Sequence, residues 1–146
     1  MPTQRKAINL GSLSRCVGFH LRLAQLAVFK DFERELGKIA VTPAVYSVLE
    51  VLQRNPGLTQ SKLASAVRLD RSSVVPLLDK LGQRGLVERL ASTTDRRHKH
   101  LYLTAAGMEL LHQAIDRVTQ HEQRVCKPFT AAEKQNLLEL LARFGG

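Results

Sequence analysis

The sequence is poor in cysteine and in long apolar runs, and each shortage excludes a class of protein. Two cysteines, Cys16 and Cys126, are too few for a disulfide scaffold. No apolar run approaches the roughly 20 residues that a membrane-spanning helix requires. The N-terminal stretch also lacks the apolar segment and cleavage site of a secretory signal. We therefore expect a cytoplasmic protein with no membrane segment.

The sequence also lacks the motifs of common catalytic sites. It contains no G-x-S-x-G, no glycine-rich phosphate loop and no recognisable set of histidine, carboxylate and nucleophile. His98 with His100, and His112 with Asp116, each share one face of an element, but neither pair has an evident third ligand for a metal. The sequence thus predicts no enzyme, no metal site and no cofactor. His98 and His100 are instead expected to contact or flank phosphate.

Acidic side chains are scarce as well, and the resulting positive charge indicates a negatively charged partner. The chain has 22 lysines and arginines against 13 acids, which gives a formal net charge of +9. Two thirds of this excess lies between Arg54 and His100, so the positive charge is concentrated in the middle of the chain. A basic domain of this kind favours a polyanion as partner, although a merely solvated basic face is the alternative.

The apolar pattern predicts helices at both ends of the chain. The stretch from Leu13 to Leu36 reads as a long helix that is apolar on more than one face, so it must be buried from several sides. In a chain of 146 residues, this excess indicates a second subunit. Further helices are expected after good N-cap residues, namely Thr42, Thr59, Asp70, Thr104 and the capping box that Thr130 forms with Glu133.

The middle of the chain predicts a fold. Three helices end near Gly85 and precede two short β-like segments, 86–92 and 100–104, with a basic hairpin tip between them. This is the order of a winged helix-turn-helix. The expected fold class is therefore mainly α with a small β-hairpin, flanked by N- and C-terminal helices.

Such a fold places specific side chains against DNA. The helix that begins at Arg71 would enter the major groove with its first turn, and the hairpin tip would reach the backbone and the minor groove. Asp95 is expected to hold an arginine of the wing in place. The predicted DNA-binding residues are Ser61, Lys62, Arg71, Ser72, Ser73, Val74, Lys80, Arg96, Arg97 and Lys99.

Two spaced motifs then carry a family resemblance. The first, D-x-L-x-x-x-G-L-V, comprises Asp79, Leu81, Gly85, Leu86 and Val87. The second, D-x-R followed by L-T-x-x-G, comprises Asp95, Arg97, Leu103, Thr104 and Gly107. With these motifs, the chain resembles the MarR family of bacterial regulators over its whole length.

The resemblance implies a homodimer that binds a pseudo-palindromic operator in double-stranded DNA and is released by a small molecule. It implies a single unit, 1–146, with dimerisation helices at 10–37 and 104–146 around a winged lobe at 42–103. Arg97 would be the minor-groove arginine, and repression is the family default. Pro76 departs from the family pattern, because it removes an amide hydrogen bond inside the recognition helix.

The resemblance also implies where a ligand enters, between the first helix and the winged lobe. The expected lining combines apolar walls with a few polar groups, which suits an aromatic acid; it comprises Arg15, Cys16, Phe19, His20, Arg22, Leu23, Ala24, Phe29 and Tyr46. The segment 18–32 is similar to regulators of aromatic-acid breakdown, some of which respond to the acyl-CoA thioester. In that case, basic residues near the pocket mouth would bind the CoA phosphates.

Two alternatives remain open from the sequence. Cys16 lies near the start of the first helix, where the peroxide-sensing branch of the family keeps its reactive thiol, and Arg15 beside it could lower the thiol pKa. A non-specific architectural DNA binder would use the same positive charge without a ligand pocket. Sequence preference separates this second alternative from a regulator.

Overall fold

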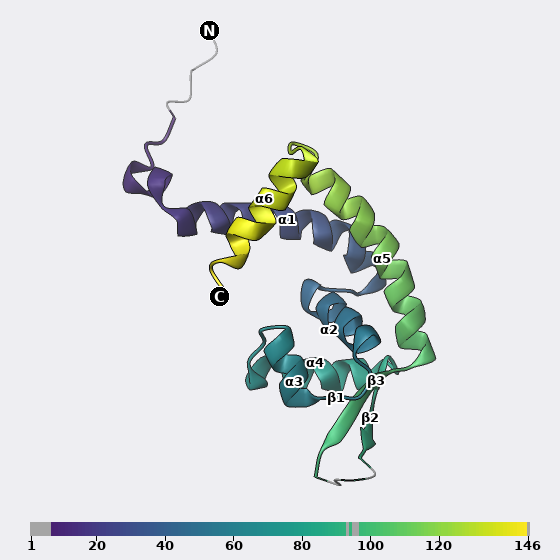
Figure 1. Cartoon of the computed structure of the whole chain (residues 1–146). Coiled ribbons are helices and arrows are strands. Elements are labelled where there is room, and N and C mark those ends of the chain that lie inside the picture. Colours follow the sequence, from purple (N-terminus) through teal and green to yellow (C-terminus); the bar gives the residue numbers. More distant parts are fainter. Residues whose placement is uncertain (1–6, 93, 95–96, 146) are drawn as a thin grey trace.

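The computed structural model describes residues 7–92, 94 and 97–145, and it confirms a mainly helical chain with a small antiparallel sheet. The elements in chain order are η1 (Gly11–Arg15), α1 (Val17–Leu36), η2 (Gly37–Ile39), α2 (Pro43–Arg54), β1 (Leu58–Thr59), α3 (Gln60–Ala66), α4 (Arg71–Gln83), β2 (Val87–Ala91), β3 (Lys99–Leu103), α5 (Ala105–Val125) and α6 (Ala131–Ala142). In Figure 1, α5 runs from the sheet to α6, and the hairpin of β2 and β3 projects at the end away from α6.

The predicted helix starts are confirmed by their cap hydrogen bonds. In each case, the capping side chain accepts from a backbone N–H in the first turn, which satisfies one of the donors that a helix start leaves free. The caps are Thr42, Thr59, Asp70 and Thr104, and Thr130 forms the predicted reciprocal capping box with Glu133. Local sequence therefore determines where these helices begin.

The first helix begins later than its apolar pattern predicts. Cys16 has an extended backbone (φ −86°, ψ 116°), so the short η1 ends there and α1 starts at Val17. Pro76 does not interrupt the recognition helix, because α4 continues from Arg71 to Gln83. Among the described residues, no helix is long and apolar enough to cross a membrane.

The sheet has one strand more than the predicted hairpin. The strand order is β1-β3-β2, with β2 and β3 paired antiparallel from Val87 opposite Leu103 to Ala91 opposite Lys99. The additional strand, β1, pairs Leu58 with Leu101. Two residues are too few to show an alternating pattern, so this strand could not be predicted from its own residues.

The two family motifs meet at the start of α5. The Thr104 hydroxyl donates to the Gly85 carbonyl at 2.6 Å, and the Thr104 amide donates to the Leu86 carbonyl at 3.1 Å. A Cβ on Gly107 would lie 2.1 Å from the Leu86 carbonyl oxygen, so only glycine allows this close approach. Gly85 has a φ of +69°, which also favours glycine. The motifs thus fix how α5 leaves the sheet.

The hydrophobic core lies in the winged lobe and in the parts of α1 and α5 that adjoin it. Leu36, Leu49, Leu78, Leu101 and Leu111 are nearly inaccessible and come from five different elements. By contrast, η1 and α6 contain no buried residue among those described. Their exposed apolar side chains, with those of α1, include Leu13, Val17, Leu21, Leu26, Leu137, Leu138, Leu140 and Leu141.

Candidate nucleic-acid interface and ligand cavity

A basic cleft lies between α3, the start of α4 and the wing. Its volume is about 410 Å³, and its lining includes Arg71, Arg97 and Lys99. Ser61 from the start of α3 also lines it, and the remaining walls are Thr59, Gln60, Ala64, Val74 and His98. The fold therefore brings together predicted DNA-binding side chains that lie up to 38 positions apart in the sequence, from Ser61 to Lys99.

The first turn of α4 is exposed and is ordered by its cap. The Asp70 carboxylate accepts from the Ser73 amide at 2.8 Å and from the Ser72 hydroxyl at 2.9 Å. These hydrogen bonds hold the pKa of Asp70 below its ordinary value. Arg71, Ser72 and Ser73 remain exposed beside the cleft, where they can meet the edges of bases.

Val74 requires a correction. Its side chain is 1% exposed and belongs to the core, so the predicted contact with a thymine methyl is not available to it. The reason lies in the helical spacing, because Val74 shares its face of α4 with the buried Leu78 and Leu81.

The wing residues fall into two groups. Asp95 and Arg96 lie outside the described residues, while Arg97 and Lys99 face the cleft. His100 differs from expectation: its Nδ1 lies 2.7 Å from the Gly57 carbonyl oxygen, so it joins β3 to the turn after α2. This contact gives His100 a place in the base of the wing.

Two other predicted DNA contacts do not line the cleft. Lys62 on α3 and Lys80 on α4 are both exposed. Sequence reasoning missed the ion pair between Arg89 on β2 and Asp79 on α4, whose Nη2 and Oδ1 atoms are 2.9 Å apart. This pair fastens the wing to the recognition helix.

A second cavity lies where α1 ends and α2 begins. Its volume is about 380 Å³, and it is lined by Phe29, Phe32, Glu33, Gly37, Ala40, Val41, Thr42 and Pro43. A surface groove that shares Phe29 and Glu33 with the cavity continues along α1 past Gln25, Leu26 and Lys30. Of the predicted ligand residues, only Phe29 lines either hollow.

The remaining predicted ligand residues lie elsewhere. All but Tyr46 lie between Arg15 and Ala24, in η1, at the junction after it or in the N-terminal part of α1. Of these, Phe19 is half-buried, and the exposed ones are Arg15, Cys16, His20, Arg22, Leu23 and Ala24. Cys16 is a free thiol whose Sγ donates to the Ser12 carbonyl at 3.4 Å. His20 Nε2 lies 2.9 Å from the Ser14 carbonyl oxygen.

Tyr46 lies behind the cavity wall. Its ring contacts that of Phe32 edge-on at 6.5 Å between centroids, and its hydroxyl donates to Glu50 at 3.0 Å. Burial, together with this hydrogen bond, raises the pKa of Tyr46 to about 12. The hydroxyl therefore stays protonated at neutral pH.

The cavity wall is joined to the recognition helix. Ala40 has a left-handed backbone (φ 53°), and the Val41 and Ala40 amides donate to the Leu36 and Gly37 carbonyls, as in a Schellman motif. The Ala40 carbonyl accepts from Arg84 Nη1, at the end of α4, at 2.9 Å. Position 40 holds alanine and not glycine, so residue type did not predict the left-handed backbone here, although α1 ends at Leu36 as predicted.

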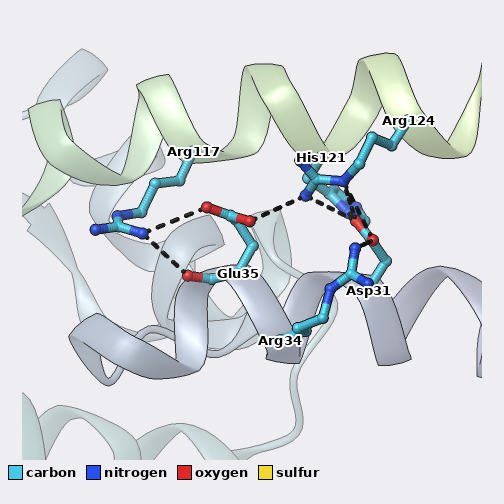
Figure 2. Close-up of polar contacts among 6 residues, drawn as sticks. All are labelled: Asp31, Arg34, Glu35, Arg117, His121 and Arg124. Carbon is cyan, nitrogen blue, oxygen red and sulfur yellow. Dashed lines mark hydrogen bonds and ion pairs between the residues drawn. The ribbon is translucent and has the colours of Figure 1, made fainter.

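A polar cluster joins α1 to α5 beside the cavity. Figure 2 shows Asp31 and Glu35 of α1 facing Arg117, His121 and Arg124 of α5. Asp31 accepts from Arg124 Nη2 at 3.1 Å and from His121 Nδ1 at 2.8 Å, and these hydrogen bonds lower its pKa to about 2.

The polar cluster also contacts the cavity wall. The His121 ring is 2% exposed and lies edge-on to Phe32, with 5.3 Å between centroids. Sequence reasoning missed the cluster. The available signal was the spacing, because Asp31 and Glu35, like Arg117 and His121, lie four residues apart and so share one face of a helix.

Comparisons with known proteins agree with this geometry. Residues 41–99, which include the cleft, match the model of the MarR family. A protein of Thauera aromatica whose name assigns it to regulation of the hcr operon is 40% identical over 134 residues, covering 91% of this chain and 81% of that protein.

Two solved structures of the transcriptional repressor CouR extend the likeness. CouR bound to a 23-mer DNA duplex has a TM-score of 0.91 and 37% identity, covering 97% of this chain and 100% of that one. CouR bound to p-coumaroyl-CoA has a TM-score of 0.87 and 35% identity, covering 95% of this chain and 98% of that one. The relatives are transcriptional regulators, not enzymes, and the chain is therefore a transcriptional regulator that belongs to the MarR family.

Proposed function

We propose that the protein is a repressor that binds an operator as a homodimer and is released by a small aromatic acid or its acyl-CoA thioester. The observation that carries the DNA-binding part is the cleft in which Arg71, Arg97 and Lys99 converge beside the start of α4. A helix N-terminus with flanking cations is suited to the phosphates and base edges of a duplex.

The contacts divide by role. Arg71, Ser72 and Ser73 would meet base edges in the major groove, and Arg97 would enter the minor groove, where a narrow A/T-rich segment has enhanced negative potential. Phosphates would be contacted by Ser61, Lys62, Lys80 and Lys99. This division separates residues that set sequence preference from residues that set affinity.

The proposed dimer explains the apolar ends of the chain. Segments 10–37 and 104–146 would interlock between two copies, while 42–103 would remain the DNA-binding lobe. Exposed leucines on α1 and α6 support this arrangement, since a lone soluble chain rarely leaves a contiguous apolar surface. A two-fold dimer presents two recognition helices to two half-sites of a pseudo-palindrome.

The cavity supports the ligand-responsive part. Its apolar walls and its place between α1 and the winged lobe suit an aromatic group. A related repressor, CouR, is known bound to p-coumaroyl-CoA, and the PcaV regulator is known with its natural ligand. A ligand in the cavity would shift the backbone at Ala40, and the hydrogen bond from Arg84 to the Ala40 carbonyl would pass this shift to α4.

Fluorescence anisotropy tests the DNA-binding part. The probe is the DNA upstream of the protein's own gene at about 0.15 M salt, with random duplex as competitor. We expect a preference of roughly 10³-fold for the specific site. Equal competition by random DNA would instead indicate an architectural binder. Release is then measured with aromatic acids and their CoA thioesters, and an organic peroxide with Cys16→Ser tests the peroxide-sensing alternative.

Two arginine variants test the assigned roles. Arg97→Ala should weaken operator binding and reduce the salt dependence by about one phosphate contact. Arg71→Ala should relax sequence preference, at a cost of about 1–3 kcal/mol at the operator. Lys38→Ala is the control, because Lys38 lies on η2, outside the cleft. A uniform loss across all sequences in Arg71→Ala would restrict that residue to a phosphate contact.

A further inference from the structure

The cavity at the end of α1 has a charge that does not suit a free aromatic acid. Its walls are largely apolar, with Phe29, Phe32, Val41 and Pro43 among them. Glu33 is the one ionisable side chain among the residues that line it, and it is acidic. An aromatic group can therefore enter, but a carboxylate attached to that group would meet no cation within the cavity.

Lys30 is the one cation among the residues that line the cavity or its groove, while the Arg84 guanidinium bonds the Ala40 carbonyl of the cavity wall without lining the cavity. Lys30 lines the adjoining groove and not the cavity, while Glu33 and Phe29 line both. The order from inside to outside is thus apolar wall, carboxylate, then ammonium. A ligand that follows this order has an uncharged aromatic end and an anionic group on a longer arm.

Electrostatics determines which ligands such a layout excludes. Taking a carboxylate out of water costs free energy unless a cation or hydrogen-bond donors replace the water. A second carboxylate nearby adds repulsion, which water partly screens because Glu33 is exposed. A thioester replaces the charged carboxylate with a neutral carbonyl and moves the negative charges to distant phosphates.

Resting on the function proposed above, we propose that Glu33 is a specificity-determining residue that excludes free aromatic carboxylates from the cavity. The effector is an aromatic acyl group in neutral linkage, with its anionic extension directed along the groove toward Lys30. This choice decides between the two effector classes that the proposed function leaves open.

Isothermal titration calorimetry with three probes tests the inference on the full-length protein. The probes are p-coumarate, its uncharged methyl ester and p-coumaroyl-CoA. The ester shares the aromatic group of the acid but lacks both its charge and the CoA arm, so it separates the effect of charge from that of the phosphates. We expect the ester to bind at least tenfold more tightly than the acid.

Glu33→Gln should reduce the affinity difference between the methyl ester and p-coumarate. The change removes the repelling charge at nearly constant size, so it should raise the affinity for p-coumarate roughly fivefold to tenfold. Lys30→Gln should weaken p-coumaroyl-CoA more than the methyl ester. Glu109→Gln is the matched control, because Glu109 is exposed on α5, lines neither the cavity nor its groove, and accepts a hydrogen bond from Gln113.

The outcomes distinguish this inference from the function on which it rests. If p-coumarate binds as tightly as its ester and Glu33→Gln changes neither affinity, the role of Glu33 is wrong while an aromatic effector stands. If none of the three probes binds although the operator does, both the effector part of the proposed function and this inference fail. If Glu109→Gln narrows the affinity difference between the ester and the acid as much as Glu33→Gln does, that difference arises from the overall charge of the protein. This result would overturn the inference.

Discussion

The winged lobe and the end helices differ in how they satisfy their apolar side chains. Leu49 and Leu101 are almost fully buried within one chain, whereas Leu137, Leu138 and Leu141 on α6 are 38% to 53% exposed. The lobe therefore has its own core, while η1 and α6 bury none of their apolar side chains in the part of the chain that the structure describes. We therefore expect folding of the lobe and the proposed assembly of the ends to respond to different mutations.

The largest effect is expected from charging the end helices. Leu137→Asp with Leu141→Asp places two carboxylates one turn apart on α6, in the surface proposed to face a second copy. Burying such charges without partners should raise the dimer dissociation constant at least a thousandfold, about 4 kcal/mol. Analytical ultracentrifugation measures this change. Asn136→Asp is the control on the same helix, and a dimer as tight as the wild type would remove α6 from the interface.

A cavity in the core of the lobe should cost less free energy than the charges on α6. The cost should lower the stability of the fold and not the affinity of the dimer. Leu49→Ala removes a side chain with 0% exposure from the core, and comparable truncations cost about 3 kcal/mol. Chemical denaturation followed by circular dichroism measures the free energy of unfolding. Unlike the α6 substitutions, this one should destabilise the chain at every protein concentration. An effect confined to the dimer equilibrium would contradict the separation of the two regions.

Asp31→Asn tests the polar cluster that joins α1 to α5. The Asp31 pKa of about 2 lies below its ordinary value of 3.8, so the carboxylate stabilises the fold above pH 3.8 and this stabilisation is lost as pH falls toward 2. The difference corresponds to about 2 kcal/mol at neutral pH. We expect Asp31→Asn to lose that amount at pH 7 and to flatten the acid part of the stability profile. Asp116→Asn, at an exposed position on α5, should do neither.

The smallest effect is expected at the junction of the two regions. Ala40→Gly relieves a left-handed backbone that costs an alanine about 1 kcal/mol. The gain is partly offset because glycine is more flexible in the unfolded chain, so the net increase in stability should be about 0.5 kcal/mol. Thermal denaturation measures it. A loss of stability would mean that the methyl group packs usefully against the cavity.

The sequence predicted the features that depend on local chemistry. Thr42, Asp70 and Thr104 cap helices through contacts three residues away, so their role is visible in a short stretch. The cleft was also predictable, because the order of helices and strands places Arg71 and Arg97 together. The proposed DNA contacts of these residues remain predictions.

Features that depend on long-range contacts were not predictable from the sequence. The bond from Arg84 to Ala40 spans 44 residues, and that from His121 to Asp31 spans 90. The two-residue strand β1 exists because β3 offers it a partner. The predicted ligand residues stay a prediction, although only Phe29 among them lines the cavity at the end of α1 or its groove. Apolar periodicity identifies a helix face but not the point along it where a neighbouring loop turns away.

The Arg84 bond has a consequence for how the regulator would behave in a cell. If ligand binding at the cavity weakens operator binding through this bond, then operator binding must weaken ligand binding by the same factor, because the coupling free energy has no direction. Free regulator would therefore sense the effector at a lower concentration than regulator already seated on DNA. The number of operator copies would then set the response threshold, and losing the Arg84 guanidinium would make that threshold independent of copy number.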